Sequence, residues 1–289
     1  MGIKICPECG GKVSDTRTTC MHCGYDFAAA PQKILCPDCD EWVVKNADGT
    51  CPVCGHVFDT AKIDTALRKE KAAAETMAQT ATAKQTEREK IIDECRKYMT
   101  IEKGDLIEYT GKLAHVIIPP EVTTIFLGAC DGHEEMKILD IPDTVTELCA
   151  CCFSRCGITS LVIPDSITDI SGFDRCISLI KVTLPSTATI INGTAFEGCS
   201  SLPYISIPDK VESIWLRAFK DCTALARVEL PTSLKIIKEG AFENCAALTT
   251  IVYKGTKAQW KAVTKEKGWD KKVGKYTVHC TDGDIKERG

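Results

Sequence analysis

The second half of the chain repeats one pattern of apolar and polar residues. Six segments each place aliphatic residues around a proline, and these prolines recur at intervals of about 21 to 23 residues: Pro119, Pro142, Pro164, Pro185, Pro208 and Pro231. An isoleucine or leucine stands six residues after each of these prolines. One such unit cannot bury its own apolar face, whereas a stack of units can. The pattern therefore predicts a solenoid over residues 104–254, with six to seven repeats of about 21 to 23 residues.

Alternation along a strand predicts which side chains of each repeat reach solvent. Residues one and three before each proline should point into the core, and residues two and four before it should point outward. The predicted outward face carries His115, Ile117, Ile138, Asp140, Ser160, Val162, Lys181, Thr183, Tyr204, Ser206, Arg227, Glu229, Thr250 and Val252. Aromatic and charged residues together are typical of the centre of a protein interface. Lys181, Tyr204, Arg227 and Glu229 are therefore the candidate partner-binding residues, and the alternative is a solvated sheet whose partner binds elsewhere.

Cysteine recurs at one position of the repeat. Cys156, Cys176, Cys199, Cys222 and Cys245 share this position, which predicts a buried ladder of small packing groups. The stretch "LCACCFSRC" adds Cys149 and Cys151 outside the pattern. Ordinary packing in a turn is the favoured interpretation of these two residues, and a redox or metal cluster is the alternative.

The repeats resemble the BspA-like leucine-rich-repeat family of bacteria, whose units read roughly "IPxxVxxIxxxAFxxCxxLxxV". The resemblance is carried by "AFEGCSSL", "AFKDCTAL" and "AFENCAAL", and it covers about residues 104–280 with the closing segment. It implies a parallel β-sheet on the concave face, an irregular or short helical convex side, and a C-terminal cap over residues 255–289. Two departures stand out: Cys130 occupies a phenylalanine position, and the third unit is two residues short at "SGFDRC".

Four CxxC pairs lie near the N-terminus, ahead of position 60. Their cysteines are Cys6, Cys9, Cys20, Cys23, Cys36, Cys39, Cys51 and Cys54. A CxxC places two thiolates on one tight turn, and two such turns supply the four sulfurs of a tetrahedral Zn²⁺ site. The spacing predicts zinc ribbons over residues 1–30 and 31–59, with two structural zinc ions in all. Disulfides, redox chemistry and iron are the alternatives. A catalytic zinc is disfavoured because four thiolates leave no open coordination position.

This stretch resembles the double zinc-ribbon modules at the N-termini of many bacterial and archaeal proteins. The resemblance covers about residues 4–58 and implies a small metal-dependent β-fold. With so few apolar residues, the segment would draw most of its stability from zinc, about 10 kcal/mol or more per site.

Residues 60–103 predict a helical linker. The segment from Thr60 to Lys103 contains neither glycine nor proline and is rich in alanine, glutamate, lysine and glutamine, which favour helix. An apolar stripe forms only near its end, at Ile91, Ile92, Cys95, Tyr98 and Met99. We expect this stripe to dock on the repeats, and a weak helical dimer through the linker is the alternative.

Composition and charge limit which cellular compartment and which class of partner we expect. The chain has 289 residues and a formal net charge of −4, and no apolar run approaches the roughly 18 residues of a membrane span. It begins "MGIKICPEC", without the apolar stretch of a secretory signal, so we expect a cytoplasmic protein in which the thiols stay reduced. Acidic residues outnumber basic ones over 104–254, which disfavours a nucleic-acid partner.

No catalytic motif emerges from the sequence. The five histidines are scattered, and the chain contains no GxSxG, P-loop or HExxH. The sequence therefore predicts a non-enzymatic, multi-domain adaptor that binds a protein partner through its repeats. The alternatives are a nucleic-acid-associated zinc-ribbon protein and a thiol-redox protein.

Overall fold

The computed structural model describes residues 3–5, 12–14, 22, 34–36, 40–44, 51–53 and 60–288. The chain forms two compact units, Met1–Thr82 and Ala83–Gly289. The boundary falls within the long helix α1 (Thr60–Arg96).

The first unit contains two small antiparallel hairpins. Strand β1 (Ile3–Ile5) pairs with β2 (Lys12–Ser14), and β3 (Ile34–Leu35) pairs with β4 (Trp42–Val43). The first strand of each hairpin ends directly before a cysteine, Cys6 or Cys36, that begins a CxxC pair. Each of these two CxxC pairs therefore lies between the two strands of a hairpin in the sequence.

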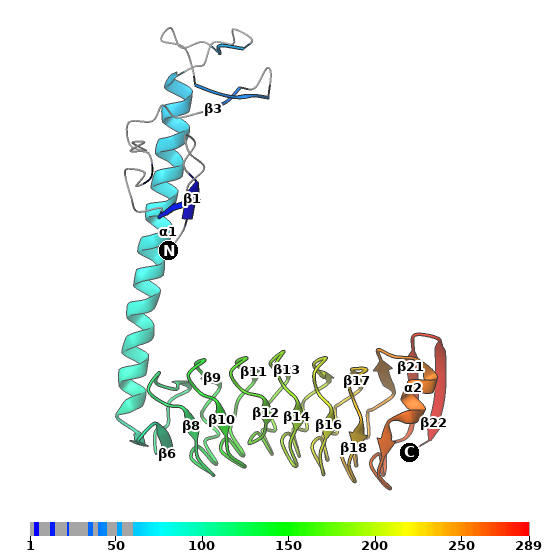
Figure 1. Cartoon of the computed structure of the whole chain (residues 1–289). Coiled ribbons are helices and arrows are strands. Elements are labelled where there is room, and N and C mark those ends of the chain that lie inside the picture. Colours follow the sequence, from blue (N-terminus) through cyan, green and yellow to red (C-terminus); the bar gives the residue numbers. More distant parts are fainter. Residues whose placement is uncertain are drawn as a thin grey trace. The chain divides into compact units, whose positions relative to one another are not determined.

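The second unit is a stack of turns that runs from left to right in Figure 1, and each turn contributes two short strands. The first series of strands contains β7 (His115–Ile117), β9 (Ile138–Asp140), β11 (Ser160–Val162), β13 (Lys181–Thr183), β15 (Tyr204–Ser206), β17 (Arg227–Leu230), β19 (Thr250–Tyr253) and β21 (Lys275–Cys280). The second series contains β8 (Thr124–Ile125), β10 (Glu147–Leu148), β12 (Asp169–Ile170), β14 (Ile190–Ile191), β16 (Ser213–Ile214), β18 (Ile236–Ile237) and β20 (Thr264–Lys265). The result is a β-solenoid of about eight turns.

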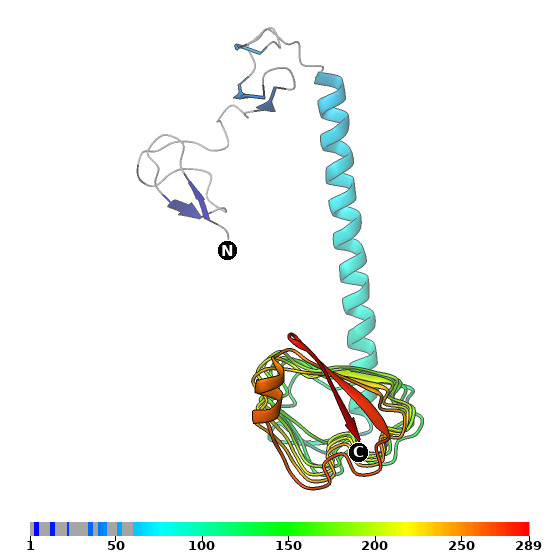
Figure 2. The ribbon, with the colours of Figure 1, turned by 90° about the vertical axis from the view of Figure 1, so that its right-hand side faces the viewer.

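Neighbouring strands of each series pair in parallel, except between β13 and β15 in the first series and between β10 and β12 in the second. The predicted register holds in the first series, where Tyr204 lies opposite Arg227 and Arg227 opposite Thr250. The view along the stack in Figure 2 superposes the turns around one common core. Parallel neighbours at equivalent repeat positions place identical residue types side by side, which is how the repeat builds its core.

An irregular or short helical side was expected opposite the first series, and the second series excludes the helical form between residues 104 and 254. Between residues 104 and 254 that side consists of two-residue strands and turns. Each turn contains residues in the left-handed region, such as Arg175 (φ 57°), Gly198 (φ 76°), Asp221 (φ 59°) and Asn244 (φ 62°) directly before the ladder cysteine. A residue with positive φ ends helical winding, so the turn cannot extend into a helix.

Aromatic rings form the centre of the solenoid. Phe153, Phe173, Phe196, Phe219 and Phe242 are fully buried, and neighbouring rings lie nearly parallel with centroids 5.2 to 5.9 Å apart. Trp269 closes the stack with its ring perpendicular to that of Phe242. Each ring from Phe173 to Phe242 is shielded on both sides by its neighbours, which makes the stack the continuous core of the repeats.

Antiparallel strands and a helix cover the two ends of the stack. Strand β5 (Met99–Glu102) pairs antiparallel with β6 (Asp105–Tyr109) at one end, and β22 (Gly283–Arg288) pairs antiparallel with β21 at the other. Residues 99–102, assigned above to the helical linker, therefore form a strand, and α1 ends at Arg96. The helix α2 (Lys257–Ala262) buries Trp260 in the closing segment. These elements protect the open edges of the stacked sheets.

The short third unit coincides with an interruption of the second series. Strands β10 and β12 belong to separate sheets, and the segment "SGFDRC", which lacks two residues, follows β12 directly. Gly172 has φ +95° there, and a Cβ atom at this position would lie 2.4 Å from Cys152 Sγ. The chain passes too close to the neighbouring turn for any residue but glycine, while Phe173 keeps its place in the ring stack.

Candidate partner-binding face

Three of the four candidate partner-binding residues lie together on β15 and β17. The guanidinium of Arg227 donates to Glu229 Oε1 at 2.8 Å, and the hydroxyl of Ser206 donates to Glu229 Oε2 at 3.4 Å. The hydrogen bond from Arg227 lowers the pKa of Glu229, which keeps this carboxylate charged. The side chain of Tyr204 is 41% exposed beside this network. The cluster offers a partner an aromatic ring next to an ordered ion pair.

The fourth candidate, Lys181, lies on the other side of an interruption in the first series. A four-stranded sheet ends at β13 and a five-stranded sheet begins at β15, so these two neighbouring strands do not pair. A groove of about 890 Å³ runs along the interruption and is lined by both Lys181 and Tyr204. Val182, predicted to point into the core, is partly exposed in this groove.

The helix α1 covers the first turn of the predicted outward face. Ile117, predicted to be exposed, is 1% exposed, and its backbone N–H donates to Cys95 Sγ at 3.4 Å. Cys95 is itself fully buried, and Arg96 binds Glu121 through two hydrogen bonds of 2.8 and 2.9 Å. The prediction that Ile117 is exposed is therefore wrong. The strand alternates as predicted, but α1 covers the outward side chain.

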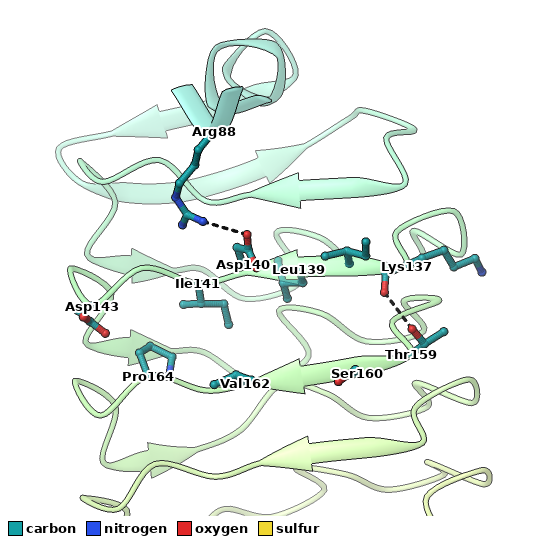
Figure 3. A pocket seen from close by; sticks show the side chains of 11 residues that line it. Arg88, Lys137, Leu139, Asp140, Ile141, Asp143, Thr159, Ser160, Val162 and Pro164 are labelled. Atoms are coloured by element: carbon teal, nitrogen blue, oxygen red, sulfur yellow. Dashed lines mark hydrogen bonds and ion pairs between the residues drawn. The ribbon is translucent and has the colours of Figure 1, made fainter. Parts of the chain in front are cut away.

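A second hollow lies where α1 meets the face. Figure 3 shows Arg88 reaching from the helix to Asp140, with 3.1 Å between Nη1 and Oδ2. His115 Nε2 lies 3.3 Å from the same carboxylate oxygen. The hollow has a volume of about 450 Å³ and is lined further along by Val162 and Pro164. Asp140 is occupied by two partners of its own chain, so its carboxylate is not free to bind a partner.

The ladder cysteines are hydrogen-bond donors as well as packing groups. Each thiol donates to a carbonyl of the preceding repeat: Cys156 to Cys130 at 3.0 Å, Cys176 to Phe153 and Cys199 to Phe173 at 3.2 Å, Cys222 to Phe196 and Cys245 to Phe219 at 3.1 Å. Burial raises the pKa of these thiols, to about 12 for Cys199 and Cys245. Burial also raises the pKa of Cys149 and Cys151, so both lack the activated thiolate that exchange chemistry needs.

We expect the ladder cysteines to resist alkylation in the folded chain. Iodoacetamide at pH 8 should leave Cys199, Cys222 and Cys245 unmodified until urea unfolds the solenoid, because the thiols are buried and protonated. The partly exposed Cys280 is the internal control and should react before the ladder cysteines. Mass spectrometry of the digested chain measures each site, and native labelling of the ladder at the rate of Cys280 would contradict the packing role.

The raised pKa values also predict a loss of stability in alkaline solution. A thiol whose folded pKa is about 12 and whose unfolded pKa is near 9.0 contributes fully below pH 9 and loses its contribution as the pH rises toward 12. Urea denaturation at a series of pH values between 8 and 11 measures the loss. A midpoint that stays constant across this range would show that the ladder thiols do not titrate with raised pKa values.

Two of the eight predicted zinc ligands lie within the described residues. Cys36 and Cys51 are both buried. Cys6, Cys9, Cys20, Cys23, Cys39 and Cys54 lie outside the described residues, so their arrangement stays a prediction. Within the described ranges alone, no three His, Cys, Asp or Glu residues form a metal-binding group.

The turns around Cys36 and Cys51 have specific local geometry. The N–H of Asp40 donates to the carbonyl of Cys36 at 2.9 Å, and Asp40 has φ 54°. Asp40 stands where the other three CxxC pairs have glycine, the residue suited to this conformation. The N–H of Val53 donates to Cys51 Sγ at 3.4 Å.

None of the helices between residues 60 and 288 is long and apolar enough to cross a membrane.

Comparison with known proteins identifies related repeats. The family described as "BspA type Leucine rich repeat region" matches residues 103–172 and 171–262, with six copies of its repeat. A leucine-rich repeat protein of Eubacterium ventriosum is 28% identical, with a TM-score of 0.50 over 63% of this chain and 51% of its own. No curated protein matches the chain.

Two further solved structures show similarity over part of their length. A leucine-rich repeat protein of T. pallidum is 26% identical over 54% of this chain and 69% of its own, with a TM-score of 0.40. A leucine-rich cell surface protein of Faecalibacterium prausnitzii is 22% identical over 53% of this chain and 62% of its own, with a TM-score of 0.38. The chain thus spans 62% of the F. prausnitzii protein and 51% of the E. ventriosum protein.

Proposed function

The chain belongs to the BspA-type leucine-rich repeat family, and we propose that its solenoid is a non-enzymatic adaptor that binds a protein partner. The recognition surface in this proposal is the outward face of β13, β15 and β17. The observation that carries it is the Tyr204 cluster: an exposed aromatic ring beside the Arg227–Glu229 ion pair and next to a groove.

Several properties of this cluster suit protein recognition. Tyrosine and arginine are the residues that most often dominate binding energy in interfaces, because they combine a large contact area with hydrogen bonding. Tyr204 lies directly opposite Arg227 in the parallel register, so the two side chains adjoin on one face. The Arg227–Glu229 pair holds the guanidinium in one orientation before a partner arrives, which reduces the entropy lost on binding.

Replacing Tyr204 and Arg227 with alanine should weaken partner binding at least about thirtyfold, because truncating one anchor of this kind typically costs ~2 kcal/mol or more. The full chain should be used as bait in lysate, and the captured proteins should be compared by quantitative mass spectrometry. The affinity for the main captured protein should then be measured at matched ionic strength. The melting temperature should barely change, because both side chains point away from the core.

A matched double variant tests whether the effect is specific to this face. Trp215 and Leu216 are both 45% exposed and lie in the turn after β16, in the second series. Their replacement with alanine should leave the captured proteins unchanged. If the Trp215/Leu216 variant loses the partner and the Tyr204/Arg227 variant keeps it, the interface lies on the second series and the proposal is wrong.

We also propose that the first unit holds two structural zinc ions, one in each predicted ribbon. In support, β3 and β4 bracket the Cys36 CxxC pair as a hairpin, and Asp40 takes the left-handed conformation required after it. The N–H donated to Cys51 Sγ would stabilise a thiolate. Zinc would supply cross-linking only, since four thiolates leave no coordination position for a substrate. Thiolate ligands require a reducing environment, so a cytoplasmic location is part of this proposal.

A further inference from the structure

The groove beside β15 has a specific cause in the sequence. Along most of the first series, the residue directly before each strand donates its backbone N–H to the equivalent carbonyl of the preceding turn: Lys137 to Ala114, Thr159 to Lys137, Ile180 to Thr159, Ala226 to Pro203 and Thr249 to Ala226. Pro203 occupies this position before β15 and has no N–H to donate. The ladder is therefore interrupted where a proline replaces a donor residue, between β13 and β15.

The interruption leaves the facing main-chain groups of β13 and β15 without ladder partners. Neighbouring strands on either side remain paired, with three register pairs between β11 and β13 and three between β15 and β17. Even β9 and β11, the most weakly joined neighbours, keep the pair Ser160 and Ile138. Unpaired N–H and C=O groups at a strand edge are the groups with which an extended peptide forms hydrogen bonds.

The walls of the groove are largely apolar. Ile180 is 59% exposed at one side, and Val182, Pro203 and Ile207 also line the groove. Tyr204 adds an exposed aromatic ring at the opposite side. Apolar side chains that alternate with backbone hydrogen bonds along an extended segment would therefore find contacts in the groove.

The charge of the rim is positive. Lys181, Lys210 and Lys254 line the groove together with one acidic residue, Asp209, and Lys254 forms an ion pair with Asp209. Within the described part of the chain, neither Lys181 nor Lys210 has an acidic partner. Two uncompensated lysines stand on a repeat region that is otherwise acidic. This local field favours a negatively charged segment.

We propose that the groove between β13 and β15 is the docking site for an extended acidic peptide segment of the partner. In this proposal the segment places apolar side chains against Val182 and Pro203, and its carboxylates face Lys181 and Lys210. The inference rests on the proposed function, since it names the part of the partner that the face recognises. It adds that Pro203 creates the site by keeping the sheet open.

The probe is a fluorescein-labelled peptide of alternating glutamate and valine, about seven residues long, which is long enough to pair with a short strand edge. Its binding to the full chain is measured by fluorescence anisotropy. The same peptide with lysine in place of glutamate should bind at least about tenfold more weakly, and higher salt should narrow this difference. A third peptide with N-methylated valines lacks half of its backbone donors and should also bind more weakly.

Two variants of the chain test the lysines and the proline. Replacing Lys181 and Lys210 with glutamate should weaken binding of the acidic peptide at least about tenfold, whereas replacing Lys112 and Lys261, two exposed lysines elsewhere, should not. Pro203→Ala restores the N–H and allows β13 and β15 to pair, so it should also weaken binding while leaving the fold intact. Far-ultraviolet circular dichroism and a melting curve establish that each variant is folded.

The outcomes separate this inference from the proposed function. Equal binding of the acidic peptide to the Lys181/Lys210 and Lys112/Lys261 variants, or undiminished binding to a folded Pro203→Ala chain, would overturn it. Self-association that disappears in Pro203→Ala would overturn it in favour of a second copy as occupant. If the Tyr204/Arg227 variant loses the partner but Pro203→Ala keeps it, only this inference is overturned. If the chain binds the acidic peptide but the Tyr204/Arg227 variant still captures the partner, the groove is supported and the proposed face is overturned.

Discussion

Replacing Phe219 with alanine should lower the free energy of unfolding of the solenoid by about 3 to 5 kcal/mol. Phe219 is fully buried, and its ring stacks between Phe196 and Phe242, with centroid distances of 5.5 and 5.2 Å. Alanine would remove the ring and leave a cavity between two fixed neighbours, which cannot collapse without separating adjacent turns. Urea denaturation followed by circular dichroism measures the change.

Phe126 supplies a matched control for this substitution. It is also a phenylalanine of the repeats, but it lies in the turn after β8 and is 46% exposed. Its replacement with alanine should change the free energy of unfolding by less than about 1 kcal/mol. If Phe126→Ala cost as much as Phe219→Ala, the stability would not come from the buried ring stack.

The spacing of the repeats predicted the core because packing there is local and periodic. Positions such as Phe219 and Cys222 recur at the same distance from the proline in four of the six repeats, and parallel stacking converts this recurrence into contacts between neighbouring turns. The resemblance to a known repeat family added the phenylalanine position. The second series of strands was missed because two residues are too few to show a periodicity of their own.

The candidate site depends on features that break the repeat, and these were harder to predict. Ile117 follows the alternation of a strand, yet it is buried because α1 covers the first turn, a long-range contact that periodicity does not contain. Pro203 was visible in the sequence. The interruption that it causes could be predicted only if the residue at this repeat position were known to donate a ladder hydrogen bond. The left-handed residues before three of the five ladder cysteines had a similar visible signal: glycine, aspartate or asparagine at Gly198, Asp221 and Asn244.

The predicted zinc sites would stabilise the first unit by cross-linking, whereas the solenoid is stabilised by its buried core. The described strands of the first unit contain two or three residues each, and hairpins of this size are marginal without cross-links. The turn after Cys36 nevertheless forms with Asp40 at φ 54°, a conformation that disfavours side chains other than asparagine, aspartate and glycine. A tetrahedral metal bound by two CxxC pairs would supply the cross-link that hairpins of this size need.

Replacing Cys36 and Cys51 with serine should remove one of two zinc ions per chain and unfold the second ribbon. Loss of the metal would withdraw about 10 kcal/mol from a segment that has little core of its own. The zinc content of freshly reduced protein, measured by elemental analysis, should fall from about two to about one per chain. The solenoid should keep its melting temperature, because its core lies in residues of the second unit. As a control, Cys149→Ser with Cys280→Ser removes two partly exposed thiols of the second unit and should leave the zinc content at two. A zinc content near zero in the reduced wild-type chain, or an equal loss of zinc in the control variant, would show that the CxxC pairs do not form the predicted sites.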